Sequence, residues 1–141
     1  MTPAPGYQTF RMLLIDDNDA DVYLLQRALR KAGLNIEFTV LRDGAEGLAF
    51  ARGEDESAPR PDLVVLDLNL PKSGGAAVLR AMKGNPALAL VPVVVMSSSA
   101  SKAEQAVIAE LGVVKYLTKP PDLAGFMKVG EMFRELLLHG I

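Results

Sequence analysis

The sequence contains no cysteine and a single histidine, His139. Without cysteine the chain has no disulfide bonds, thiolate nucleophiles or cysteine-ligated metal sites, and one histidine cannot form a histidine cluster. Any metal ion held by side chains must therefore be bound mainly by oxygen atoms. His139 follows the last apolar position of the final predicted helix, and we interpret it as a solvated residue near the end of the chain.

Strong charge and long apolar runs are also missing. The 15 basic and 17 acidic residues give a formal net charge of −2, which offers no electrostatic reason to bind nucleic acid or an anionic membrane. No apolar run approaches the roughly 18 residues that span a bilayer, and the N-terminal residues lack the pattern of a signal peptide. These absences favour a cytoplasmic protein whose partners are proteins or small ligands, with no nucleic acid and no membrane among them.

The composition is that of one soluble domain. The chain has 141 residues, of which 50% are hydrophobic and 23% are charged, so a single compact core is expected. We predict a domain over residues 10–138, with a flexible N-terminal tail at 1–9 and a short C-terminal tail at 139–141.

Short apolar runs alternate with segments of helical periodicity. The expected strands are 12–15, 36–41, 63–67, 91–96 and 113–118. The first expected helix has its N-cap at Asp19 and ends before Gly33, and the next two are expected at 44–52 and 76–83. A fourth helix should start at a capping box formed by Ser101 and Glu104, and a fifth should start near Asp122. Because the strands are continuously apolar, they predict a parallel sheet with helices on both faces.

Parallel sheets bind ligands outside the carboxyl ends of their strands. At these ends the sequence has Asp16 and Asp17, then Asp67, Ser97 and Lys119, and each of them alone would be an ordinary loop or cap residue. Together, three carboxylates that repel one another favour a bound divalent cation, and Mg²⁺ fits such oxygen ligands. A hydroxyl and an ammonium suit phosphoryl oxygens, so the strand ends predict phosphoryl chemistry with an aspartate at its centre.

Five pieces of sequence, in this order, carry a resemblance to a known family. They are IDD at 15–17, LDLNLP at 66–71, Ser97, Tyr116 and TKP at 118–120. The arrangement resembles the receiver domain of two-component response regulators over about residues 10–138. The resemblance implies a CheY-like, flavodoxin-like α/β fold, a (βα)5 arrangement with a doubly wound, five-stranded parallel sheet.

The resemblance also implies roles in phosphoryl transfer. Asp67 would be the phosphoacceptor, which attacks a phosphoryl group carried by a kinase histidine. Asp17 and Asp67 would bind Mg²⁺ directly, Asp16 largely through water, and Asn69 through its backbone carbonyl. The chain would be a phosphoacceptor signalling protein rather than an enzyme, although it would assist its own phosphotransfer and dephosphorylation.

Further residues would bind the phosphoryl group or move in response to it. By the resemblance, Lys119 would pair first with Asp67 and then with the phosphoryl oxygens. Ser97 would turn inward to bind the phosphoryl group, and Tyr116 would follow it from an exposed to a buried position. A cis peptide bond would precede Pro120.

The implied phosphoryl donor is a sensor histidine kinase. DDNDADVYLLQRAL at 16–29, DLNLPKSGG at 67–75 and TKPPDL at 118–123 resemble the small regulators that partner bacterial phytochrome-type kinases. Because the sequence ends with the fifth helix, we expect a stand-alone regulator that docks to a downstream protein or passes the phosphoryl group on. The fourth helix, fifth strand and fifth helix would form the face for such a partner or for a homodimer, with charged contacts from the basic residues Lys115, Lys128 and Arg134.

Two positions depart from the usual family pattern. Gly74 stands where Asp is usual, and Ser98 stands where Ala or Gly is more typical. We expect these changes to affect the rates of phosphorylation and dephosphorylation, and not the phosphoacceptor itself.

Three other functions fit the sequence less well. A haloacid-dehalogenase-type phosphatase needs a second acid two residues after its nucleophile, where this chain has Asn69. A flavin-binding flavodoxin needs a phosphate-binding loop after the first strand, where this chain has two aspartates. A degenerate receiver that serves only as a scaffold is disfavoured by the intact acidic residues, Ser97 and Lys119.

Overall fold

The computed structural model describes residues 8–55, 58–72, 74–98 and 101–140. Strands and helices alternate through them as the sequence predicts. The strands are β1 (Thr9–Ile15), β2 (Asn35–Leu41), β3 (Leu63–Leu66), β4 (Val93–Ser97) and β5 (Lys115–Thr118). The helices are α1 (Asp19–Lys31), α2 (Gly44–Ala51), α3 (Gly74–Lys83), α4 (Lys102–Leu111) and α5 (Leu123–His139). Within the described ranges, every helix is too short or too polar to cross a bilayer.

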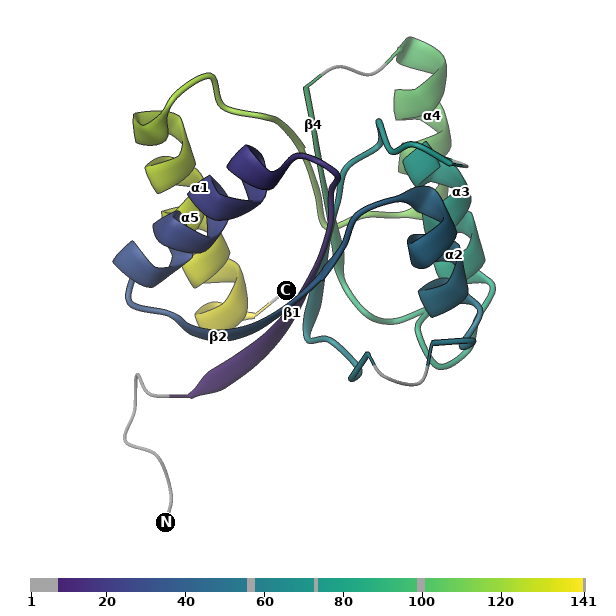
Figure 1. Ribbon diagram of the computed structural model, residues 1–141, viewed down its shortest axis with the longest axis horizontal. Helices are drawn as coiled ribbons and strands as arrows, with labels where there is room; N and C mark the ends of the chain where they lie inside the picture. The colour runs from purple at the N-terminus through teal and green to yellow at the C-terminus, as the bar shows by residue number, and fades with distance from the viewer. Residues whose placement is uncertain (1–7, 56–57, 73, 99–100, 141) are drawn as a thin grey trace.

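The strands form one parallel sheet in the order β2-β1-β3-β4-β5. Helices α1 and α5 cover one face of the sheet, and α2, α3 and α4 cover the other (Figure 1). The predicted doubly wound, CheY-like α/β fold is therefore confirmed. The chain moves from β1 outward to β2 and then crosses to β3 on the other side of β1, so the direction of winding reverses between β1 and β3. Open α/β sheets bind ligands at such a switch point.

Apolar side chains cover both faces of the sheet. In β1, Leu13 and Ile15 belong to the buried cluster under α2, α3 and α4, whereas Met12 and Leu14 belong to the cluster under α1 and α5. All of β3, with the sequence LVVL, is buried. Because successive side chains of a strand point to opposite faces, a strand covered on both sides has no polar positions. This explains why β3, most of β4 and the end of β1 read as continuous apolar runs, whereas the edge strands β2 and β5 also carry polar residues.

Helix α5 packs closely against α1. A Cβ atom added at Gly130 would lie 2.7 Å from the carbonyl oxygen of Ala28, so glycine permits an approach that no other residue would allow without a shift. Phe126 and Phe133, on the same helix as Gly130, are buried in the cluster that α1 shares. This packing fixes α1, whose first turn faces the carboxyl edge of the sheet.

Some predicted boundaries differ from the observed ones. Asn18 caps α1, because its side-chain oxygen accepts a hydrogen bond from the backbone N–H of Asp21 (3.1 Å); the predicted cap at Asp19 is wrong by one residue. Strand β4 starts two residues later than predicted, just after Pro92, which has no backbone N–H to donate to a neighbouring strand. The predicted capping box of Ser101 and Glu104 is confirmed.

The predicted cis bond before Pro120 is wrong. That peptide bond is trans, and no cis bond occurs among the described residues. The trans form is the default even before proline, since only about 5–6% of such bonds are cis in folded proteins. With the trans bond, the backbone N–H of Lys119 donates to the carbonyl oxygen of Ser97 at 2.9 Å, and the lysine ammonium still reaches the acidic residues described next.

Candidate functional site

Three aspartates form an acidic pocket at the switch point. Asp16 and Asp17 directly follow β1, and Asp67 directly follows β3. The two strands are neighbours, and the backbone N–H of Asp67 donates to the carbonyl oxygen of Ile15 at 2.9 Å. As a result, carboxylate oxygens of the three aspartates all lie within 4.8 Å of one another. The predicted convergence of these residues is therefore observed, and we call this cluster of Asp16, Asp17 and Asp67 the acidic pocket.

Asp67 lies at the bottom of the acidic pocket, and its side chain is well partnered. The residue is only 4% exposed, and burial of an unpartnered carboxylate would be costly. One carboxylate oxygen accepts a hydrogen bond from the backbone N–H of Asn69 (2.9 Å), and the other accepts one from the Lys119 ammonium (2.8 Å). These two bonds explain how an aspartate can follow so apolar a strand.

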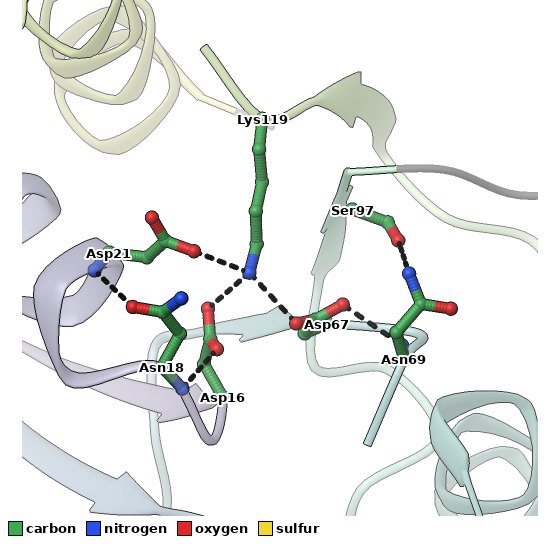
Figure 2. Close-up of polar contacts among 7 residues, drawn as sticks. All are labelled: Asp16, Asn18, Asp21, Asp67, Asn69, Ser97 and Lys119. Atoms are coloured by element: carbon green, nitrogen blue, oxygen red, sulfur yellow. Dashed lines mark hydrogen bonds and ion pairs between the residues drawn. The ribbon is translucent and has the colours of Figure 1, made fainter. Parts of the chain in front are cut away.

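The ammonium of Lys119 contacts three carboxylates at once (Figure 2). Its Nζ atom lies 2.8 Å from Asp67, 3.0 Å from Asp16 and 2.7 Å from Asp21. An ammonium has three N–H donors, so each carboxylate can receive one. Burial alone would lower the pKa of Lys119, but the hydrogen bonds to the three carboxylates raise it above its ordinary value. The lysine is therefore a firmly charged counter-ion of the pocket.

Sequence reasoning missed Asp21. This residue lies in the first turn of α1, where an acidic side chain is usually explained by the positive end of the helix dipole. The only available signal was its position four residues after Asp17, which places both near the same end of the helix. The contact partner, Lys119, is 98 residues away in the sequence.

Burial raises the pKa of the Asp16 carboxyl above its ordinary value of 3.8, although a hydrogen bond from the backbone N–H of Asn18 (2.9 Å) and the Lys119 ammonium act in the opposite direction. The nearby charge of Asp67 raises this pKa further. The pocket thus carries more negative charge than one ammonium neutralises, and its ionised form is costly to the folded protein.

Asp16→Asn should consequently stabilise the protein when no divalent cation is bound. With a raised pKa in the folded state, Asp16 contributes stability below pH 3.8, and that contribution is lost as the pH rises through the folded-state value. At neutral pH the amide should therefore raise the free energy of unfolding, by on the order of 1 kcal/mol. Urea unfolding in chelator at neutral and at acidic pH measures this, and the gain should shrink in acid.

Asp62→Asn is the matched control for that measurement. Asp62 lies before β3, at the opposite edge of the sheet, and accepts a hydrogen bond from the backbone N–H of Arg11 at 2.8 Å, which an amide oxygen can also accept. At both pH values, Asp62→Asn should differ little from the wild type in its free energy of unfolding. A loss of stability in Asp16→Asn at neutral pH would show that the ion pair with Lys119 outweighs the crowding of carboxylates.

Ser97 ends β4 beside the acidic pocket and is 1% exposed. Its hydroxyl oxygen accepts a hydrogen bond from the side-chain amide of Asn69 at 3.0 Å (Figure 2). The family resemblance implied a role only for the backbone carbonyl of Asn69, and this side-chain contact was not predicted. It connects the loop after β3 to the residue that the family resemblance assigns to the switch.

Tyr116 lies on β5, paired with Val95 of β4, and is half-buried. Its ring packs against the cluster under α2, α3 and α4. Burial, followed by the negative charge of Glu104 on α4, raises the pKa of the Tyr116 hydroxyl above 10.0. The side chain therefore belongs to the surface between α4 and β5, and does not contact the acidic pocket through any described hydrogen bond.

Backbone contacts fix the loop that follows Asp67. The N–H of Gly44 at the start of α2 donates to the carbonyl oxygen of Pro71 at 2.7 Å. A Cβ atom at Gly75 would lie 2.7 Å from the Cα atom of Leu68. Gly74 has a φ of +70°, a conformation that glycine adopts without the strain of other residues. A side chain at this position would therefore strain the backbone.

The side chains present fit a hard divalent cation. The acidic pocket offers only oxygen ligands, and mutual repulsion among its three carboxylates would be relieved by a doubly charged ion. Asp67 is buried, Asp16 is half-buried and Asp17 is exposed, so one side of the pocket stays open to water, which Mg²⁺ commonly retains as ligand. Residues that could hold the ion are the three aspartates, with the loop of Asn69 beside them.

The fold and the acidic pocket define a doubly wound α/β protein with three clustered carboxylates and a largely buried lysine at its switch point. Residues 12–129 match the response regulator receiver domain, and the chain belongs to this family. The resemblance noted in the sequence is therefore confirmed, and a phosphatase of the haloacid-dehalogenase type or a flavin-binding flavodoxin is excluded as its family.

Individual relatives cover nearly the whole chain. Response regulator Rcp1 of Synechocystis sp. is 42% identical over 132 residues, which are 92% of this chain and 90% of Rcp1. The crystal structure of the Mn²⁺-bound form of Rcp1 is similar with a TM-score of 0.82 and 38% identity, covering 94% of this chain and 96% of that one. The phosphorylated cyanobacterial phytochrome response regulator RcpA is similar with a TM-score of 0.86 and 36% identity, covering 95% and 98%.

Proposed function

We propose that this receiver domain accepts a phosphoryl group on Asp67 from a sensor histidine kinase. The observation that carries the proposal is the position of the Asp67 carboxylate, buried between the Lys119 ammonium and the other aspartates of the acidic pocket. A carboxylate beside a cation site and an ammonium is suited to attack phosphorus, because both positive groups offset the charge of the incoming phosphoryl oxygens.

The proposed step forms one bond and breaks another. A carboxylate oxygen of Asp67 attacks the phosphorus of the kinase phosphohistidine, the phosphorus–nitrogen bond breaks, and the imidazole leaves with the electron pair and takes up a proton. Mg²⁺, held by Asp16, Asp17, Asp67 and the backbone carbonyl of Asn69, would neutralise charge on the phosphoryl oxygens when bound. The product is an acyl phosphate on Asp67.

The chain's own donors would hold the new group. Lys119, whose pKa is raised, would keep its proton and donate to a phosphoryl oxygen. The Ser97 hydroxyl would exchange its present contact with Asn69 for the phosphoryl group, to which it can donate. These contacts exist only after phosphorylation, and a difference in binding between two states is what shifts their populations.

The proposed output is a changed surface over α4, β5 and α5. Tyr116 is the half-buried residue on this surface that would respond to movement of Ser97, and Lys115, Lys128 and Arg134 are available for contacts with a downstream protein or a second copy of the chain. A phytochrome-type kinase is the proposed donor, supported by the relatives that include a phytochrome response regulator. Phosphorylation would replace the single negative charge of the Asp67 carboxylate by the roughly 1.5 to 2 negative charges of a phosphoryl group with strong acceptor oxygens.

Metal dependence tests the proposal. Incubation with acetyl phosphate and Mg²⁺ should add one phosphoryl group per chain, measured by intact-protein mass spectrometry. In excess chelator the rate should fall by at least about a hundredfold, the usual cost of removing a major electrostatic partner of the transition state. Equal labelling with and without chelator would refute a metal-assisted site, and no labelling in either case would favour a degenerate receiver that acts as a scaffold.

A further inference from the structure

Asp21 makes the shortest of the three contacts to Lys119, with 2.7 Å between its carboxylate oxygen and Nζ. It differs from the other two partners of the lysine, because Asp16 and Asp67 belong to the acidic pocket and Asp21 does not. Its side chain is 23% exposed and that of Lys119 is 10% exposed, so water screens this ion pair only in part. The pair is therefore strong enough to influence where the ammonium lies.

The position of Asp21 is fixed by its helix. Its backbone N–H donates to the side-chain oxygen of Asn18, the N-cap of α1, at 3.1 Å. The next residue, Val22, is buried in the cluster under α1 and α5. Figure 2 shows Asp21 and Asp67 on opposite sides of the Lys119 ammonium. A carboxylate held in this place pulls the ammonium away from Asp67 and toward α1.

All three donors of the ammonium are engaged in the present arrangement. A divalent cation in the acidic pocket would compete with Lys119 for the oxygens of Asp16 and Asp67. The carboxylate of Asp21 would remain available to the lysine, because it lies outside the cluster of candidate ligands. A phosphoryl group on Asp67, in contrast, would have to compete with Asp21 for the same ammonium.

We propose that Asp21 is a positioning residue that holds the Lys119 ammonium away from the cation site and also away from the phosphoryl group. It favours Mg²⁺ binding, because it gives Lys119 a partner other than the metal ligands, and it weakens binding of the phosphoryl group, because it competes for the lysine. By these two effects Asp21 sets the balance between the unphosphorylated and phosphorylated states. This inference rests on the proposed function of the acidic pocket.

Two binding constants of Asp21→Asn, measured by calorimetry, test the inference. For Mg²⁺ alone, affinity should fall about threefold to tenfold, because Lys119 turns to Asp16 and Asp67 and a negative charge is lost. For beryllofluoride at saturating Mg²⁺, affinity should rise by a similar factor, the range expected for one partly screened charge pair. A residue with a merely structural role would weaken both constants, so the opposite signs are the signature.

Asp19→Asn is the matched control. Asp19 lies in the same first turn of α1 and carries the same charge, but it pairs with the exposed Arg42 and not with Lys119. Both of its constants should stay within about twofold of the wild type, since exposed ion pairs contribute little. Asp21→Ala, which removes the charge and the acceptor together, should shift the constants in the same directions as Asp21→Asn.

The possible failures are distinguishable. If the wild type binds no beryllofluoride with Mg²⁺, the proposed function itself is wrong. If the wild type binds it but both constants of Asp21→Asn weaken, stay unchanged, or follow those of Asp19→Asn, the positioning role is wrong. Loss of folding in both Asp21→Asn and Asp21→Ala, seen by far-ultraviolet circular dichroism, would also overturn it in favour of a structural role.

Discussion

Asp67→Asn is expected to lose phosphoryl incorporation from acetyl phosphate completely, to below the detection limit of mass spectrometry. An amide oxygen is a far poorer nucleophile than a carboxylate, and no other described carboxylate has the same combination of burial and contact with Lys119. The fold should persist, because the amide oxygen can still accept the hydrogen bond from the N–H of Asn69 and Lys119 keeps Asp16 and Asp21 as partners.

Asp62→Asn serves as the control for this loss, because it makes the same chemical change at the opposite edge of the sheet. It should be labelled at the wild-type rate. Asp67→Glu keeps the charge but moves the carboxylate by one methylene into space held by Lys119 and the other aspartates, and it should be labelled poorly. Undiminished labelling of Asp67→Asn would place the phosphoacceptor elsewhere.

Lys119→Met is expected to have the second largest effect, on both chemistry and stability. Loss of the ammonium removes a donor to the phosphoryl oxygens, so the labelling rate should fall by about a hundredfold to a thousandfold. It also leaves the carboxylates of Asp16, Asp21 and Asp67 without their shared counter-ion. In chelator the free energy of unfolding should drop by on the order of 2 kcal/mol, since breaking a largely buried ion pair is costly.

Lys119→Arg separates the two effects. The guanidinium keeps the positive charge, so most of the stability should return, but its planar shape cannot direct three donors at three carboxylates in the way an ammonium does. Labelling should therefore stay well below that of the wild type. Urea unfolding and the labelling rate, measured on the same preparations, check both parts. If Lys119→Met were labelled as fast as the wild type, the lysine would have no role in phosphoryl transfer.

The fold was predictable because it follows from local patterns. Continuous apolar runs such as LVVL at 63–66 can be satisfied only by a sheet covered on both faces, and polar residues that directly follow such runs must gather at one edge. This logic placed Asp16, Asp67 and Lys119 together without any knowledge of three-dimensional contacts. The same logic gave the positions of most helices, because their caps and glycine stops are local signals.

The parts that were missed depend on contacts between distant residues. Asp21 looked like an ordinary acidic residue in the first turn of a helix, and only the tertiary fold, in which α1 packs against α5, brings it to Lys119, 98 residues further on. The side-chain bond from Asn69 to Ser97 joins residues 28 apart. The expected cis bond before Pro120 came from the family resemblance alone, and no local feature of the sequence required it.

The most direct test of the central claim is to identify the phosphorylated residue chemically. An acyl phosphate can be reduced by borohydride to an alcohol, which converts the aspartate that carried it to homoserine. After phosphorylation with Mg²⁺, reduction and proteolysis, mass spectrometry of the peptide that contains residues 63–71 should show homoserine at position 67. The separate peptide that contains residues 16 and 17 should show unmodified aspartate at both positions. Homoserine at position 16 or 17, or a stable phosphoryl group on His139, would contradict the assignment of Asp67 as the phosphoacceptor.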